Sequence, residues 1–192
     1  HFDQIHQKEE ENLQVKTIIC ERIENIDIAA LTTFKQWEEA SQLITTWQEE
    51  WKQTGFAPKK YNQSIYERYR KACDLFFEQK ANFYKQVKNE LTKNLERKRS
   101  LCGEAEALKD STDWKVTGDK LIALQKQWKE VGAVPHKYSD ELWQRFTAAC
   151  DYFFAQKKQN FAEQRKDEQA NLLKKKEILA QIEALNTEVK NA

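Results

Sequence analysis

The sequence predicts an all-α protein made of tandem three-helix-bundle repeats, joined by long continuous helices into an elongated rod. Helix breakers are scarce, with 4 Gly and 2 Pro among 192 residues. Apolar residues recur at steps of three and four, which is typical of one face of a helix. A pattern of aromatic, glycine and proline residues also returns after 77 positions, and a fixed period indicates a repeated unit.

The repeated pattern covers two stretches of the chain that share at least twelve identical residues. The first copy contains Trp37, Trp51, Gly55, Pro58, Lys60, Tyr61, Arg68, Ala72, Cys73, Asp74, Phe76 and Phe77. The second copy contains Trp114, Trp128, Gly132, Pro135, Lys137, Tyr138, Arg145, Ala149, Cys150, Asp151, Phe153 and Phe154. Because both copies keep these residues, we expect them to build each unit rather than to form a single active site.

The first predicted helix of each unit carries a narrow tryptophan face. In the second copy it covers about 113–131, and Trp114, Thr117, Leu121, Leu124, Trp128 and Val131 follow heptad spacing. In the first copy the same steps connect Trp37 and Trp51. Asp113 and its neighbours offer oxygens that cap a helix start, and Thr33 with Gln36 has the spacing of a capping box.

A short loop is predicted to end each tryptophan helix. Gly55 and Gly132 stand where a helix would end, and we expect them to adopt the left-handed conformation of a C-terminal cap. Pro58 and Pro135 follow three residues later and prevent the helix from continuing.

A long helix is predicted after each loop. Its start is placed near Asn62 or Ser64 in the first copy, where Ser64 and Glu67 have capping-box spacing, and near Ser139 in the second. Its early face is aromatic, its middle is polar, and no Gly or Pro interrupts it for about 45 residues, or about 70 Å.

The far end of the long helix occurs three times in the chain. Tyr84, Leu95, Leu101, Ala105 and Leu108 match Phe161, Leu172, Ile178, Ile182 and Leu185, which lie 77 positions later. They also match Phe2, Leu13, Ile19, Ile23 and Ile26, which lie 82 positions earlier, so the first copy has about five extra residues before Trp37. We expect each unit to pack the end of one long helix, a tryptophan helix and the aromatic start of the next long helix.

This arrangement predicts a division of the chain into four parts. Residues 1–31 would be the end of a preceding long helix that packs into unit 1, 32–108 repeat unit 1, 109–185 repeat unit 2, and 186–192 a tail. The sequence therefore resembles a piece of a longer array.

Composition argues against several classes of protein. The 32 basic and 31 acidic residues give a formal net charge of +1, so nucleic-acid binding would need a local basic patch. The four cysteines (Cys20, Cys73, Cys102 and Cys150) form no CxxC pair, and we expect reduced core thiols, as in a cytoplasmic protein. No apolar run reaches the ~20 residues of a membrane helix, so a membrane partner is not expected.

Two stretches resemble a bacterial domain-of-unknown-function family, number 349. The first is the string Trp128-Lys-Glu-Val-Gly-Ala-Val-Pro with the following Leu142–Phe154, and the second is Trp51–Pro58 with Ile65–Phe77. The resemblance covers roughly residues 14–173 and implies a helical, usually tandem, cytoplasmic domain with no established catalytic residues. Some relatives are labelled nucleic-acid-repair ATPases, but this chain lacks the GxxxxGK[ST] phosphate loop.

Catalytic chemistry is not expected. His1, His6 and His136 have no nucleophile paired with them in sequence, and no metal-ligand cluster or cofactor motif is present. The recurrent Arg68/Arg145 and Asp74/Asp151 are read as structural. We expect the aspartates to accept hydrogen bonds from a Trp indole, a Tyr hydroxyl or loop amides.

Recurrent cations are the candidate interaction residues. They comprise the loop residues Lys59, Lys60, Tyr61, Lys137 and Tyr138 and the helix runs Arg97, Lys98, Arg99, Lys174, Lys175 and Lys176. A cation beside an aromatic ring suits phosphate contact and base stacking, but it also suits a tyrosine packed under a turn.

The leading hypothesis is therefore a non-enzymatic helical scaffold or interaction module with an unidentified protein partner. The alternative is an RNA-, DNA- or ribosome-associated protein that uses these cations. A third reading is self-association of the long helices.

Overall fold

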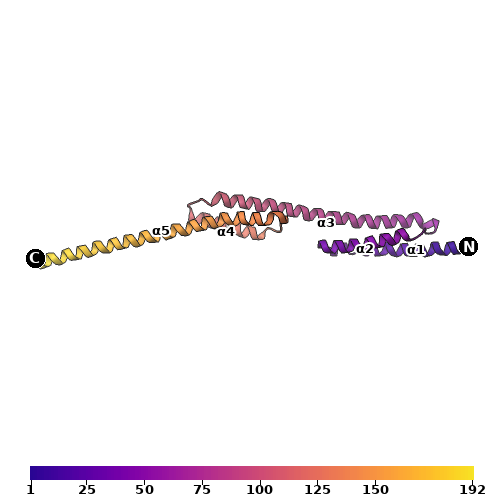
Figure 1. The fold of residues 1–192 in the computed structure, drawn as a ribbon, viewed down its shortest axis with the longest axis horizontal. Helices are drawn as coiled ribbons and strands as arrows, with labels where there is room; N and C mark the ends of the chain where they lie inside the picture. The colour runs from indigo at the N-terminus through magenta and orange to yellow at the C-terminus, as the bar shows by residue number, and fades with distance from the viewer. The chain divides into compact units, whose positions relative to one another are not determined.

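The computed structural model describes all 192 residues, and helices with short connections form the whole fold (Figure 1). The elements in order are α1 (Phe2–Glu24), the 3₁₀ helix η1 (Ile28–Ala30), α2 (Phe34–Gln53), α3 (Lys59–Leu108), α4 (Trp114–Glu130) and α5 (His136–Asn191). The predicted all-α class is confirmed. None of these helices combines the length and apolar character needed to cross a membrane.

The chain divides into two units, unit 1 (residues 1–88) and unit 2 (residues 89–192). Unit 1 contains α1, α2 and the first part of α3, and unit 2 contains the last part of α3, α4 and α5. The predicted packing of three segments in each unit is confirmed. The rod shape and the repeat boundaries at 32–108 and 109–185 stay predictions.

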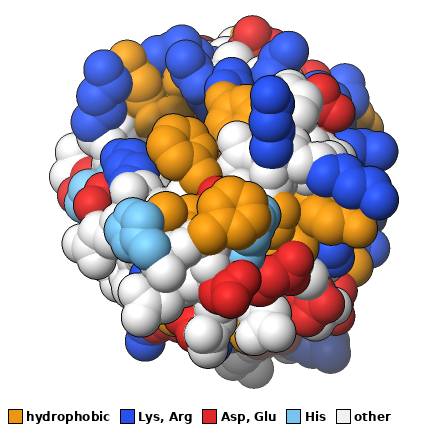
Figure 2. All heavy atoms as spheres, turned by 90° about the vertical axis from the view of Figure 1, so that its right-hand side faces the viewer, with side chains coloured by type: hydrophobic (Ala, Val, Ile, Leu, Met, Phe, Trp, Pro, Cys, Tyr) orange, Lys and Arg blue, Asp and Glu red, His pale blue; other side chains and the backbone are white.

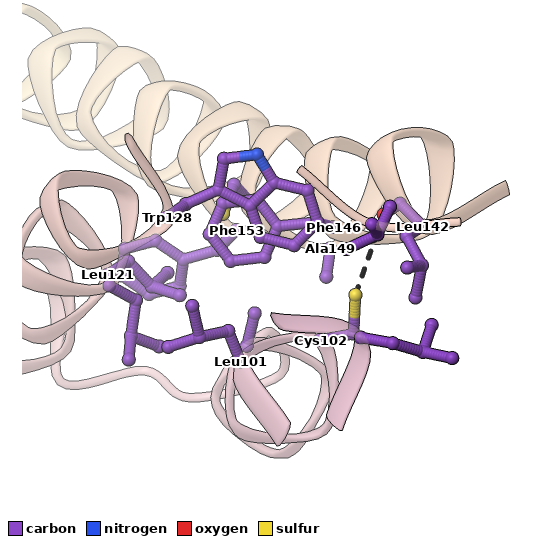
Figure 3. Close-up of a cluster of buried hydrophobic side chains, with 13 residues drawn as sticks. Leu101, Cys102, Leu121, Trp128, Leu142, Phe146, Ala149 and Phe153 are labelled. Carbon is purple, nitrogen blue, oxygen red and sulfur yellow. Dashed lines mark hydrogen bonds between the residues drawn. The ribbon is translucent and has the colours of Figure 1, made fainter. Parts of the chain in front are cut away.

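The core of unit 2 takes apolar side chains from each of its three segments (Figure 3). Leu101 and Cys102 come from α3, Leu121 and Trp128 from α4, and Phe153 from α5; all are buried. The Trp128 ring stacks on the Phe146 ring at 4.3 Å between centroids. Each large apolar side chain buried in this way stabilises the unit by about 1.5–3 kcal/mol.

Unit 1 repeats this core with substitutions of similar size. Ile19 of α1, Ile44 of α2 and Phe76 of α3 are buried together. Trp51 stacks on Tyr69 at 3.9 Å, where unit 2 has Trp128 on Phe146. The extra residues of the first copy form the 3₁₀ turn of η1, whose Ile28, together with the adjacent Leu31, packs against this core.

Two helix starts follow the predicted capping, and two do not. Thr33 and Gln36 form the capping box of α2, and Asp113 accepts a hydrogen bond from the Val116 amide at the start of α4. The predicted cap at Ser64 is wrong, because α3 already begins at Lys59. α5 likewise begins at His136 rather than near Ser139. In both cases the helix starts directly after a proline; Pro135 is the N-cap residue of α5, where the N–H that proline lacks would have no partner within the helix.

The glycines of the loops have a different role from the predicted one. No glycine has a positive φ, so the expected left-handed caps at Gly55 and Gly132 are wrong. A Cβ atom on either glycine would lie 2.9 Å from the Nδ2 atom of an asparagine, Asn12 or Asn94. Glycine lets this amide approach the backbone closely, because a Cβ atom there would force the amide to shift.

Candidate interaction surfaces

The predicted basic run and the predicted tyrosine loop of unit 2 meet at one place. The part of α3 around residues 94–99 runs beside the loop that precedes α5 and the first turn of α5. Arg99 therefore lies over the Tyr138 ring, with 5.0 Å between its Cζ atom and the ring centroid. The Nζ atom of Lys137 lies 4.8 Å from the same centroid. We call Arg99, Lys137 and Tyr138 the cation–tyrosine cluster.

The loop is held in place by a side chain of α3. Asn94 donates a hydrogen bond from Nδ2 to the Ala133 carbonyl at 2.7 Å. Lys137 and Tyr138, predicted as loop residues, lie in the first turn of α5, as Lys59, Lys60 and Tyr61 lie in the first turn of α3. The bond from Asn94 therefore holds α3, which carries Arg99, beside the start of α5.

Charge changes the acidity of the cluster's phenol. Lys137, through its hydrogen bond and its positive charge, lowers the pKa of Tyr138, and Arg99 adds to the effect. The two cations stabilise the ionised form of the phenol, and the same positive charge favours other anions at this place.

The remaining members of the run Arg97–Arg99 have framework contacts. Lys98 lies over the Trp128 ring at 4.8 Å, and Arg97 donates a hydrogen bond to the Gln127 side chain. Lys98 therefore covers the core tryptophan of its own unit, and the structural reading of this residue is favoured.

Unit 1 has a weaker version of the cluster. Lys60 lies 5.4 Å from the Tyr61 ring centroid, but α1 carries Val15 and Thr17 where α3 has Arg97 and Arg99. Lys59 shares a shallow groove of about 340 Å³ with Glu9 of α1. Figure 2 views the molecule from the N-terminal side and shows basic, acidic, histidine and apolar side chains intermixed there.

The second basic run lies apart from any loop. Lys174, Lys175 and Lys176 lie on the part of α5 whose residues are all exposed. They are not brought together with a tyrosine.

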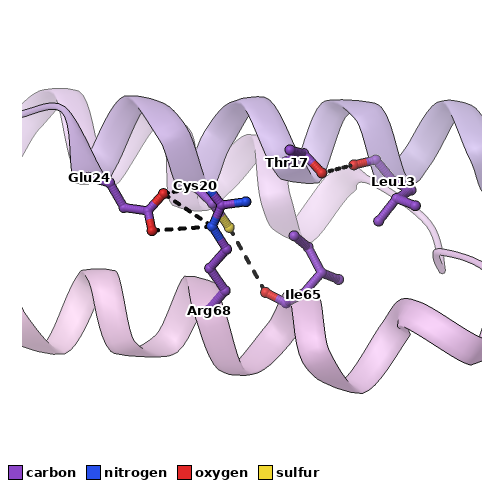
Figure 4. A network of polar contacts seen from close by, with 6 residues as sticks. All are labelled: Leu13, Thr17, Cys20, Glu24, Ile65 and Arg68. Carbon is purple, nitrogen blue, oxygen red and sulfur yellow. Dashed lines mark hydrogen bonds and ion pairs between the residues drawn. The ribbon is translucent and has the colours of Figure 1, made fainter.

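A repeated ion pair joins the long-helix segments of each unit. Arg68 of α3 donates hydrogen bonds to Glu24 of α1, the closest at 2.6 Å (Figure 4), and Arg145 of α5 does the same to Glu106 of α3. This supports the structural reading of both arginines. The predicted acceptor role of Asp74 is not found, because Asp74 pairs with Arg70 one turn away, and the buried Trp37 Nε1 has no hydrogen-bond partner.

The four cysteines are free and buried in the two cores. Burial raises the pKa of the thiols of all four, to about 11 for Cys20. Cys20 and Cys102 donate to the carbonyls of Ile65 and Leu142. These thiols are therefore poor nucleophiles at neutral pH.

Two features escaped the sequence reasoning. Trp143 is 54% exposed and borders a groove of about 260 Å³ that Trp128, Phe146 and Asp151 also line. Lys16 lies over Trp51 at 4.8 Å, as Lys98 lies over Trp128. The contact of Lys16 with Trp51 did have a sequence signal, which is the spacing of 82 residues between Lys16 and Lys98. The exposure of Trp143 has no such signal, because this residue continues the aromatic face of its helix.

Similarity to known proteins agrees with the repeated architecture. A family model described as Domain of Unknown Function (DUF349) matches residues 1–60, 64–137 and 141–192. The second and third matches start 77 residues apart, at the period of the sequence. The chain matches no curated protein and no solved structure.

Proposed function

The chain belongs to the DUF349 family, in tandem copies, and we propose that it is a non-enzymatic helical scaffold and protein-interaction module of the bacterial cytoplasm. One observation carries the proposal. Several of the reactive or charged side chains shared by both units are engaged in holding each unit together: the arginines pair with glutamates, the lysines at 16 and 98 cover tryptophans and the thiols are buried.

The surfaces that remain differ between the units. Tyr66 of unit 1 corresponds to the exposed Trp143 of unit 2, and Glu38 corresponds to Lys115. A constant core with varied exposed side chains is typical of repeat scaffolds, in which each unit presents its own surface. Exposed tryptophan is also enriched among residues that dominate protein–protein binding.

Cross-linking of the protein in its native cell, followed by nuclease treatment and mass spectrometry, tests the proposal. We expect lysines of both units to link to the same few proteins, and these links to persist when Arg99 and Lys137 are changed to glutamate. Lys98 stays unchanged because it covers Trp128.

The matched control is Trp143→Ala, which changes an exposed residue without opening the core. Links to unit 2 that weaken in this variant would place the partner at the groove beside Trp143. Links that spread over many unrelated proteins, or that disappear with nuclease, would contradict the scaffold.

Nucleic-acid or ribosome binding is the second candidate, and the cation–tyrosine cluster is the observation that favours it. Two cations beside a ring face suit a phosphate next to an unstacked base.

Fluorescence anisotropy with a single-stranded RNA tests this candidate. For two phosphate contacts, affinity should fall roughly 7-fold between about 50 and 200 mM salt. Arg99→Glu with Lys137→Glu should abolish binding. Lys174→Glu with Lys176→Glu changes the net charge equally, away from the ring, and should have a smaller effect; equal losses would reject the cluster as the site.

A further inference from the structure

The last part of α5 has an apolar face that nothing covers. From Phe161 to Ala192 every residue is exposed, and no other helix of unit 2 lies beside the yellow end of α5 in Figure 1. Leu172, Ile178, Leu179 and Ile182 form this face at helical spacing, and Ile178 is 55% exposed. A helix that stays in water has no need of such a stripe.

The same stripe is buried in both other copies of this segment. Leu95, Leu101, Cys102 and Ala105 of α3 stand 77 positions earlier and pack against α4 and α5, and Leu101 is fully buried. In α1 the equivalent residues, such as Ile19 and Cys20, pack against α2 and α3. Each time, the cover is a tryptophan helix, its Gly-to-Pro loop and the aromatic start of the following helix, which we call a Trp-helix unit.

Three polar residues on the face also match. The asparagine that holds the loop backbone is Asn12, Asn94 and, in α5, Asn171. The lysine over the core tryptophan is Lys16, Lys98 and then Lys175. The glutamate that pairs with the arginine is Glu24, Glu106 and then Glu183.

These polar positions make the face specific for one kind of partner. An apolar stripe alone would fit many helices, whereas an amide, an ammonium and a carboxylate at these spacings match a loop carbonyl, a tryptophan ring and an arginine. No contact within unit 2 uses the three residues for these roles, so they lack the partners that both other copies have.

We infer that the face of α5 formed by residues 171–185 binds a third Trp-helix unit, from another DUF349 repeat. Asn171 would donate to its loop carbonyl, Lys175 would lie over its tryptophan and Glu183 would pair with its arginine. A second copy of this chain cannot serve without opening, because α1 and α3 already cover both of its Trp-helix units. The inference concerns how repeats join and does not depend on what the scaffold binds.

The inference can be tested with an extended chain, in which a second copy of residues 109–161 follows directly after Leu185. Leu108 and Leu185 are equivalent, so the added Trp-helix unit keeps the spacing that unit 2 has. In the extended chain, the amides of 171–185 should exchange at least tenfold more slowly than the same amides do in the original chain. The amides of the added tryptophan helix should be at least as slow.

Two substitutions of the same type give the control. Leu179→Lys places a charge where Cys102 is buried and should abolish the added protection. Leu173→Lys lies at the position of the exposed Glu96 and should leave it intact. Asn171→Ala should reduce it several-fold, and protection in α2 should stay constant in every variant.

Two results would overturn the inference. One is fast exchange of residues 171–185 in the extended chain, with the added segment unfolded. The other is dimerisation of the original chain in sedimentation equilibrium that Leu179→Lys abolishes and Leu173→Lys does not, because that would assign the face to a second copy.

Discussion

Unit 1 and unit 2 share one framework but differ in the surface around the tyrosine loop. In both units an asparagine holds the loop, a lysine covers the core tryptophan and an arginine pairs with a glutamate. Only unit 2 adds Arg99 above its loop tyrosine, and only unit 1 places Glu9 near its loop lysine. The difference teaches that recurrence along this sequence marks structure, and that specificity is to be sought where the copies diverge.

The largest expected effect is on stability, and it separates the two tryptophans that border the groove of unit 2. Trp128 is buried, so Trp128→Ala should lower the free energy of unfolding by about 3–5 kcal/mol. The exposed Trp143→Ala should cost less than about 1 kcal/mol. Urea denaturation measures both changes, and equal costs would contradict the assignment of Trp128 to the framework.

Alkaline pH should weaken unit 1 through Cys20. Burial raises the pKa of this thiol from 9.0 to about 11, so the folded chain keeps a proton that the unfolded chain loses. Its contribution to stability is therefore complete below pH 9 and is lost as the pH rises to about 11, by up to about 3 kcal/mol. Urea denaturation across this range should show a smaller decline for Cys20→Ala than for the wild type; parallel declines would refute this cause.

The glycine–asparagine contact should behave alike in both units. Gly132→Ala displaces the Asn94 amide and should cost about 1–2 kcal/mol, as should Gly55→Ala with Asn12. Adding Asn94→Ala to Gly132→Ala should cost less than the sum of the two single changes, which a double-mutant cycle measures.

Gly103 provides the matched control for this cycle. It lies within α3 with no atom near its missing Cβ, so Gly103→Ala should stabilise the chain by up to about 1 kcal/mol. If Gly132→Ala were also stabilising, close approach would not explain the loop glycine.

The smallest expected effect separates the two loop tyrosines. Lys137 and Arg99 lower the pKa of Tyr138, so we expect this phenol to ionise below the usual pH range of a tyrosine. Ultraviolet absorbance should show this step disappear in Tyr138→Phe and move to higher pH in Lys137→Gln. Tyr61→Phe should leave the step unchanged. If the step disappeared in Tyr61→Phe, it would belong to the tyrosine of unit 1 instead.

Most of the fold follows from the sequence because the signals that form it are local. The steps between Trp114 and Trp128 placed α4 within a residue at each end, and the Thr33–Gln36 spacing gave the α2 cap. The cap at Ser64 failed because a capping box within a helix looks the same in sequence as one at its start, and Pro58 decided the boundary instead.

The site was less predictable because it depends on contacts between distant segments. The loop cations and the run Arg97–Arg99 were each recognised, but only packing shows that Arg99 reaches Tyr138 while Lys98 covers Trp128. The glycine requirement was found at the right residues for the wrong reason, since a close approach by Asn94, 38 residues away, leaves no local signal.

The connection between the first two helices has a practical consequence for anyone who wants to label this protein. Residues 25–33 join α1 to α2 with a 3₁₀ turn, whereas residues 109–113 join α3 to α4 at the equivalent place with a shorter link, and both units have the same core. Closing a longer loop costs little, because the entropy grows only with the logarithm of its length. The short link at 109–113 is therefore a natural insertion point for a fluorescent or affinity tag that leaves both cores and the cation–tyrosine cluster untouched.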